Sequence, residues 1–275
     1  MSLVPLAQVL TPCLTDGTAV AGLVVLGWED AVAFVRAAEA EHRPVILQAG
    51  PGCRAHMPLP VLGAMFRTLA EAASVPVVAH LDHGENAAIC QMAIDCGFTS
   101  VMYDGSSLTL EENIERTREI VALAHRQSVS VEAELGYVGY HDGAASLGTD
   151  PSEVARFARE TGIDALAVSV GNSHLMTRPD ATINQARLRA IQVAAPDLPL
   201  VLHGGSGIPA ALRRKLANET TVCKFNIGTE LRMAFGDALR TAIARDPDRY
   251  DRNQILRETI DPMIAAARVA IKTSC

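Results

Sequence analysis

The chain has 275 residues, of which 49% are hydrophobic and 20% are charged, and its formal net charge is −7. These values exclude disordered and fibrous proteins, and the length suits one large α/β or all-β domain or two average ones. The negative charge argues against a broad basic surface. We therefore expect no nucleic-acid partner, although a local phosphate pocket is compatible with this charge.

Cysteine usage and hydropathy indicate the cellular setting. The sequence begins with no basic segment followed by an apolar region, and no apolar run reaches about 18 residues, so we expect no membrane partner. Its six cysteines form no CxxC pair and no dense framework. We therefore expect reduced thiols in a cytoplasmic protein.

Short β-branched segments alternate with helical patterns along the chain. The first strand is expected at 19–26, before a helix over 28–40. Seven further strands are expected at 44–48, 75–81, 99–104, 128–135, 165–170, 198–204 and 222–227. Helical composition separates them, for example at 111–127, 151–161 and 183–193, and an additional helix is expected after Asp246.

This alternation determines the expected fold. Eight βα repeats with no Pro/Gly-rich linker and no composition break favour a closed barrel over a doubly wound sheet. We predict a single (β/α)8 TIM barrel over residues 1–275, with an extra C-terminal helix. In such barrels the polar residues at the carboxyl ends of the strands carry the chemistry.

Three histidines lie just beyond predicted strands. His83, His174 and His203 follow the third, sixth and seventh strands, so a barrel brings them together. Three neutral imidazoles with a fourth position open to water or substrate are typical of catalytic zinc. Each histidine alone more often packs or forms a structural hydrogen bond, but their equivalent positions favour a joint metal site. His80, inside the third strand, is expected to pack.

Carboxylates gather on two neighbouring strands. Glu132 and Glu134 lie on the same side of the fifth strand, and the barrel interior near its mouth suits them better than the apolar exterior. Asp104, at the end of the fourth strand, can join them. These residues fit either a secondary cation site or an internal network of ion pairs and hydrogen bonds.

Glycine-rich segments follow the last two strands. LHGGSG (202–207) and FNIGT (225–229) place small residues where backbone N–H groups can close on an anion. The loops after the seventh and eighth strands often hold phosphate in TIM barrels, although two tight turns would look the same. The pair indicates a phosphate site.

Long, ordered motifs span nearly the whole chain. They are HLDHG (80–84), SVMYDGSSLTLEENI (100–114), VSVEAELG (129–136), SH (173–174), LVLHGGSGIP (200–209) and KFNIGTELR (224–232). Through these segments the chain resembles the class II, zinc-dependent ketose-bisphosphate aldolases, which include the fructose- and tagatose-bisphosphate enzymes. The NIGTE form is more similar to the tagatose type.

The resemblance implies a metal-dependent aldolase that reversibly cleaves a ketose (bis)phosphate to dihydroxyacetone phosphate and an aldehyde. It implies one catalytic Zn2+ on His83, His174 and His203, which polarises the C2 carbonyl and stabilises the enediolate. Asp82 then moves the proton at the C4 hydroxyl. The resemblance also implies a homodimer or homotetramer.

The remaining implied roles concern cations and the substrate phosphate. Asp104 and Glu134 match an alternative metal site, so a second divalent or monovalent cation is expected there. The residues that match the segments holding the dihydroxyacetone phosphate half are Gly204, Gly205, Ser206, Asn226, Gly228 and Thr229.

Two loops depart from the family pattern. Leu175 stands where the family has a Gly after the second zinc histidine, and a positive φ is costly for Leu. The loop after the fifth strand reads GYHDG (139–143) instead of GGEED, whose flexible Glu abstracts the substrate proton. Asp142 is the nearest carboxylate in register, with His141 beside it, so Asp142 is the expected base.

Further departures indicate an altered substrate. The first strand ends in GLVVLGW (22–28) instead of an Asn/His-rich stretch, and QAGPGC (48–53) lacks the Ser or Thr often found near the phosphate. An intact metal set beside an altered pocket suggests a ketose phosphate related to tagatose or fructose 1,6-bisphosphate but not necessarily either. Its less polar portion would face Leu23, Leu26 and Leu175.

Two other functions remain open from sequence. One is a sugar-phosphate binding protein without turnover, which the altered GYHDG loop favours and Asp82 opposes. The other is a Schiff-base aldolase, for which Lys224 is the one lysine at a strand end among Lys215, Lys224 and Lys272. The alternative role for Lys224 is a structural pair with a carboxylate such as Glu132.

Overall fold

Parallel strands close into a barrel in the computed structural model, which describes residues 2–274. Each strand pairs with the next and β8 pairs with β1, so the predicted barrel is confirmed. Cys275, the last of the six cysteines, lies outside the described residues. The strands are β1 (Val20–Val24), β2 (Val45–Ala49), β3 (Val77–Gly84), β4 (Ser100–Tyr103), β5 (Ser130–Leu135), β6 (Ala165–Val168), β7 (Leu200–Leu202) and β8 (Val222–Ile227).

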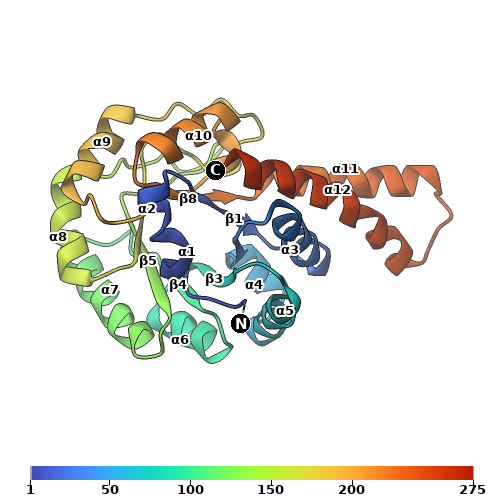
Figure 1. The fold of residues 1–275 in the computed structure, drawn as a ribbon, viewed down its shortest axis with the longest axis horizontal. Coiled ribbons are helices and arrows are strands. Elements are labelled where there is room, and N and C mark those ends of the chain that lie inside the picture. The colour runs from blue at the N-terminus through green and yellow to red at the C-terminus, as the bar shows by residue number, and fades with distance from the viewer. Residues whose placement is uncertain (1, 275) are drawn as a thin grey trace.

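Helices follow the strands and form a ring around the barrel (Figure 1). Local sequence sets their ends: Thr109 and Glu112 form a capping box that starts α7, and Asp150 caps α8, which Gly162 ends in a left-handed conformation. These helices are α3 (Trp28–Glu41), α4 (Pro51–His56), α5 (Leu59–Ala72), α6 (Ala87–Asp95), α7 (Leu110–His125), α8 (Pro151–Thr161), α9 (Gln185–Ala194), the 3-10 turn η1 (Gly205–Gly207), α10 (Ala210–Glu219) and α11 (Thr229–Arg245).

Two short helices close the amino end of the barrel. These are α1 (Leu6–Leu10) and α2 (Cys13–Asp16), which the sequence pattern did not indicate. Their buried side chains join one apolar cluster with inward-facing strand residues at this end. The strand members of that cluster are Val20, Ile46, Val78, Met102, Ala165, Ala167, Val201 and Cys223.

The C-terminal helix confirms the prediction of an extra helix after Asp246. Helix α12 (Arg252–Thr273) begins after Asp251, whose side chain caps it, and it packs against α3 and α11. Helices α11 and α12 extend together beyond the ring as an arm (Figure 1). In the described part of the chain, no helix combines the length and the apolar character needed to cross a membrane.

The carboxyl half of the barrel interior is polar. Strand alternation turns Glu132 and Glu134 of β5 inward with Lys224 of β8, as expected from their parity, and all three are buried. Gly22 of β1 makes room for Gln48 and Lys224, because a Cβ there would lie 2.1 Å from Oε1 of Gln48 and 3.0 Å from Cε of Lys224. The strands that carry the site therefore surround a barrel interior that is filled by polar groups.

Candidate active site

Three histidines converge at the carboxyl end of the barrel. His83 ends β3, His174 lies in the segment after β6, and His203 follows β7. Their ring centroids are 4.7 Å (His83–His203), 5.4 Å (His83–His174) and 5.5 Å (His174–His203) apart. One nitrogen from each ring lies within 4.8 Å of the others. The predicted set is therefore assembled in space, at separations that suit one small cation.

An unpartnered nitrogen supports a metal at this point. Nδ1 of His203 is fully buried and has no hydrogen-bond partner, which is unfavourable for a polar atom unless something binds it. Burial lowers the pKa of His203 well below its ordinary value, and burial together with the charge of His83 lowers that of His174 to about 4. Both rings are therefore neutral, as zinc ligands must be. The donor set fits zinc.

A buried network fixes the orientation of His203. Its Nε2 donates to Oε1 of Glu132 at 3.1 Å, and Oε2 of Glu132 accepts from Nζ of Lys224 at 2.6 Å. Lys224 also lies 3.2 Å from Nε2 of His80, whose Nδ1 is 2.8 Å from Ser100 Oγ. Because Glu132 engages Nε2, Nδ1 of His203 is left to face the site. Lys224 is thus a structural partner of Glu132, and His80 lies in the interior as predicted.

A second group of ligands shares His83. Nδ1 of His83 lies 2.7 Å from Oδ2 of Asp104, and Glu134 completes a set whose ligand atoms lie within 4.8 Å of one another. Burial lowers the pKa of His83, but the charge of Asp82 and the bond to Asp104 outweigh it and raise this pKa to about 10. Burial raises the pKa of Glu134 to about 8, and its Oε2 has no hydrogen-bond partner and lies 3.8 Å from Nδ1 of His203. The three predicted residues are therefore close enough for an alternative cation position.

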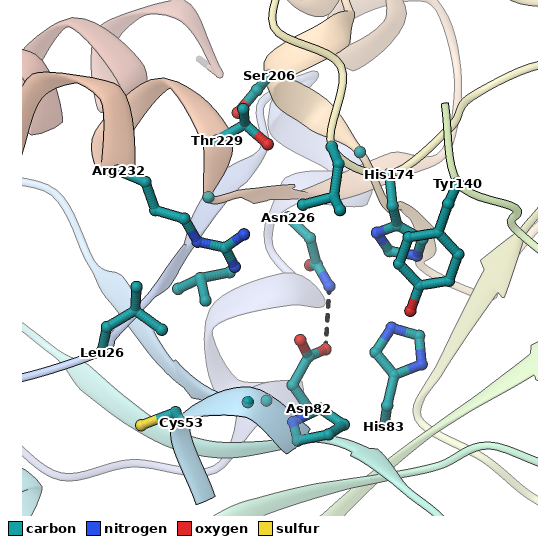
Figure 2. A pocket seen from close by; sticks show the side chains of 17 residues that line it. Leu26, Cys53, Asp82, His83, Tyr140, His174, Ser206, Asn226, Thr229 and Arg232 are labelled. Atoms are coloured by element: carbon teal, nitrogen blue, oxygen red, sulfur yellow. Dashed lines mark hydrogen bonds between the residues drawn. The ribbon is translucent and has the colours of Figure 1, made fainter. Parts of the chain in front are cut away.

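Asp82 stands beside the histidines with its carboxylate held by neighbours. It is buried, and Oδ1 accepts from Nδ2 of Asn226 at 3.2 Å (Figure 2). Nη1 of Arg54 donates to the backbone oxygen of Asp82 at 2.7 Å, and Nη2 donates to that of His83 at 3.1 Å. These bonds hold His83 in a left-handed conformation with φ 49. Nη2 of Arg54 also pairs with Oε1 of Glu85 at 2.8 Å. Sequence reasoning missed Arg54, because its bonds to backbone oxygens leave no motif.

A cavity of about 290 Å³ opens over His83, His174 and Asp82, with His203 buried behind them. Of the predicted phosphate residues, Gly204, Ser206, Asn226, Gly228 and Thr229 line it, while Gly205 lies behind them in the buried turn. The remaining lining residues are Val24, Leu26, Gly50, Pro51, Gly52, Cys53, Asp82, His83, Tyr140, His174, Leu175 and Arg232.

Two positions of this wall have unusual backbone requirements. Gly204 has φ 65, and a Cβ there would lie 2.1 Å from the backbone oxygen of Ser173, so only glycine fits the turn. Leu175 has φ 60, and its side chain remains 48% exposed in the cavity wall. Leu175 therefore adopts the left-handed conformation that was expected to be costly for leucine.

The apolar part of the wall differs from the prediction at one residue. Leu26 and Leu175 line the cavity as expected, but Leu23 is fully buried in the outer core, and Val24 faces the cavity instead. The reason is the alternation of side chains along β1: Gly22 and Val24 point inward, so Leu23 must point toward the surrounding helices.

The loop after β5 presents Tyr140 to the cavity. The ring centroid of Tyr140 lies 5.2 Å from that of His174, and the two rings are tilted by 33°. Asp142, the predicted base, and its neighbour His141 are exposed and are not among the residues that line the cavity. The site brings together the other predicted residues and leaves Asp142 on the outer side of its loop.

The fold and this set of side chains define a metal-dependent barrel enzyme. Residues 4–274 match the family described as "Fructose-bisphosphate aldolase class-II". A fructose-bisphosphate aldolase of Geobacillus stearothermophilus is 38% identical over 264 residues, covering 93% of this chain and 91% of that protein. A 6-phospho-5-dehydro-2-deoxy-D-gluconate aldolase of Shouchella clausii is 36% identical over 280 residues, covering 99% and 94%.

Solved structures agree with these relatives. The YdjI aldolase from Escherichia coli K12 has a TM-score of 0.84 and 31% sequence identity, covering 99% of this chain and 97% of that one. The chain belongs to the class II fructose-bisphosphate aldolase family. The protein is therefore a lyase that catalyses reversible aldol cleavage. Its family is zinc-dependent and acts on sugar phosphates. These findings favour the enzyme over the binding protein and over Schiff-base chemistry.

Proposed function

We propose that His83, His174 and His203 hold one Zn2+ in this aldolase, and that Asp82 moves the proton at the substrate's C4 oxygen. The observation that carries the proposal is the buried Nδ1 of His203, which has no hydrogen-bond partner and lies beside His83 and His174. These two residues line the cavity together with Asp82. Zinc, when bound, supplies the Lewis acidity that polarises the C2 carbonyl of a ketose phosphate.

Asp82 is suited to move a proton. Asn226 occupies Oδ1, and Gly50 leaves space beside Oδ2, because even a Cβ on Gly50 would lie 3.5 Å from that oxygen. As the C3–C4 bond breaks, Oδ2 takes the proton of the C4 hydroxyl, and in condensation it returns the proton to the aldehyde oxygen. Asn226 and the backbone bonds from Arg54 hold the carboxylate in one orientation.

The opposite wall would bind the dihydroxyacetone phosphate half. The η1 turn and the first residues of α11 meet there, and Oγ of Ser206 accepts from the backbone N–H of Glu230 at 3.2 Å. Glycine-rich backbone and the N-terminus of a 17-residue helix suit an anion. Arg232 also lines the cavity and has no ion pair within residues 2–274, so its guanidinium is available to an anionic substrate.

The substrate is proposed to be a ketose phosphate with a less polar portion than tagatose or fructose 1,6-bisphosphate. Val24, Leu26 and Leu175 support this, because they place apolar surface in the cavity beside the polar groups. The set of His83, Asp104 and Glu134 is proposed to hold a second divalent or monovalent cation. Asp142 stays a prediction as a second catalytic residue.

The enzyme is further proposed to be a cytoplasmic homodimer or homotetramer. The arm of α11 and α12 supports self-association, because it extends from the barrel and carries exposed apolar side chains. Those side chains are Met233, Ile243 and Val269. The free thiols of the described cysteines support a reducing compartment.

The proposal is tested by following dihydroxyacetone phosphate release from a panel of ketose phosphates. A chelator should abolish turnover, and added Zn2+ should restore it. Asp82→Asn should keep zinc content and lower kcat about 10³-fold, since a positioned acid or base contributes about 10²- to 10⁴-fold. Asp95→Asn, on the surface at the end of α6, is the matched control. Turnover that survives metal removal, or an Asp82→Asn variant at wild-type rate, would overturn the proposal.

A further inference from the structure

The loop after β5 places an aromatic hydroxyl, and no carboxylate, in the catalytic cavity. Tyr140 lines the cavity, and Figure 2 shows its hydroxyl end directed toward His83 while its ring lies against His174. The flanking side chains of His141 and Asp142 are exposed and do not line the cavity. Of these three residues, Tyr140 is the one whose polar atom faces the proposed zinc position.

The backbone keeps Tyr140 in register with the histidine segment. The N–H of His174 donates to the oxygen of Gly139 at 2.8 Å, and the N–H of His141 donates to the oxygen of His174 at 3.0 Å. On the other side, the N–H of Tyr140 donates to the oxygen of Ala144 at 3.0 Å. Because residues on both sides of Tyr140 bond to the segment of His174, the phenol is held over the metal ligands.

The aldol reaction needs a proton donor at this place. When the C3–C4 bond breaks, its electron pair remains on C3, and C3 must gain a proton before dihydroxyacetone phosphate leaves. Asp82 has just received the proton of the C4 hydroxyl, and its carboxyl group lies at the C4 oxygen and not at C3. A phenol carries one O–H group, from which it can donate a proton.

We propose that Tyr140 is a catalytic residue of this enzyme, and that it donates the proton to C3 in cleavage and removes that proton in condensation. This rests on the proposed function. In cleavage the O–H bond of Tyr140 breaks and a C3–H bond forms. The phenolate then takes a proton from water at the open mouth, where Tyr140 is 46% exposed, and Asp82 releases its proton to water, so the cycle consumes no net proton.

Proton exchange at C3 isolates this step from bond cleavage. Zinc-loaded enzyme is incubated with dihydroxyacetone phosphate in D2O without aldehyde, and the C3 proton is followed by NMR. Tyr140→Phe should slow exchange about 100-fold, the lower range for a positioned acid or base. The affinities for Zn2+ and for dihydroxyacetone phosphate should stay within about threefold of wild type, and single-turnover release of aldehyde should fall less than tenfold.

The neighbouring residues provide a matched control and a rival. His141→Ala should exchange within about threefold of wild type, whereas Asp142→Asn tests the carboxylate that the sequence favoured as the base. Exchange at the wild-type rate in Tyr140→Phe, or its loss in Asp142→Asn or His141→Ala instead, would overturn the inference while leaving the aldolase intact. A wild-type enzyme that neither exchanges this proton nor releases dihydroxyacetone phosphate from any ketose phosphate would overturn the proposed function, and the inference with it.

Discussion

The two ends of the barrel are filled in opposite ways. At the amino end, α1 and α2 cover an apolar layer that includes Ile46, Met102 and Val201. At the carboxyl end, the interior holds buried ionisable groups, among them Glu132 and Lys224. The side chains of both layers are buried, but one layer is stabilised by apolar burial and the other contains charges that must be paired.

The difference separates stability from chemistry. Apolar side chains at the amino end contribute through burial and packing alone, so their loss should affect folding and leave the site unchanged. At the carboxyl end each buried charge orients another group: Lys224 pairs with Glu132, and Glu132 orients His203. Changes there should affect folding and metal binding together.

Removing Lys224 should have the largest effect on stability. Lys224→Met leaves the Glu132 carboxylate buried without its 2.6 Å partner, which typically costs about 3–5 kcal/mol. The double variant Lys224→Met with Glu132→Gln should recover at least half of that loss, because no unpaired charge remains. Urea unfolding of the metal-free proteins measures both. Lys215→Met, on the surface of α10, should stay within about 0.5 kcal/mol of wild type. A single variant as stable as Lys215→Met would remove the distinction between the two ends.

A truncation at the amino end should affect folding only. Met102→Ala creates a cavity in the apolar layer and should destabilise the protein by about 2–5 kcal/mol. At a temperature where the variant is folded, kcat/KM should stay within about twofold of wild type. The exposed Met92→Ala is the control for loss of a methionine elsewhere. A tenfold loss of kcat/KM in folded Met102→Ala would show that the two ends are coupled.

Ionisation of Asp30, which lies near the carboxyl end, should have a smaller and pH-dependent effect on the free energy of unfolding. Burial raises its pKa to about 6, although the N–H groups of Leu26 and Gly27 that bond its carboxylate oppose this. Between about pH 4 and 6 the folded state holds a proton that the unfolded state has lost, so the free energy of unfolding falls as pH rises, by up to about 3 kcal/mol. Asp30→Asn should flatten this dependence.

Urea unfolding of wild type and of Asp30→Asn at pH 4.5 and pH 7 tests this prediction. Wild type should lose more stability between these values than Asp30→Asn does, because only wild type carries a buried carboxyl that ionises in this window. An equal loss in the two proteins would show that Asp30 ionises in the fold as easily as in the unfolded chain.

Much of the fold and metal site could be predicted because it depends on strand alternation. Short β-branched segments between helical patterns located the strands, and equivalent positions at the strand ends brought His83, His174 and His203 together. The alternation of side chains along β1 explains the error at Leu23. The prediction placed Leu23 on the same face as Leu26, but β1 directs Val24 to the cavity. Strand position was predictable to within a few residues, but a shift of one residue reverses the face.

Features that depend on loops and on backbone contacts could not be predicted. Helices α1 and α2 span 5 and 4 residues, too few for a periodic pattern. Arg54 acts through carbonyl oxygens, and the side-chain directions of Tyr140 and Asp142 depend on bonds to the segment of His174. Residue type suggested the carboxylate of Asp142 as the base, whereas the geometry of the loop places the phenol of Tyr140 in the cavity.

The proposed aldolase site at the carboxyl end of this barrel is assembled on His203 and its two partner histidines. The most direct measurement is a zinc titration of metal-free wild type and of His203→Ala, with zinc affinity and dihydroxyacetone phosphate release recorded on the same samples. Wild-type turnover should rise to a plateau at one Zn2+ per chain, while His203→Ala should bind zinc at least about 100-fold more weakly and show no turnover. Turnover before zinc is added, or wild-type zinc affinity in folded His203→Ala, would contradict the account.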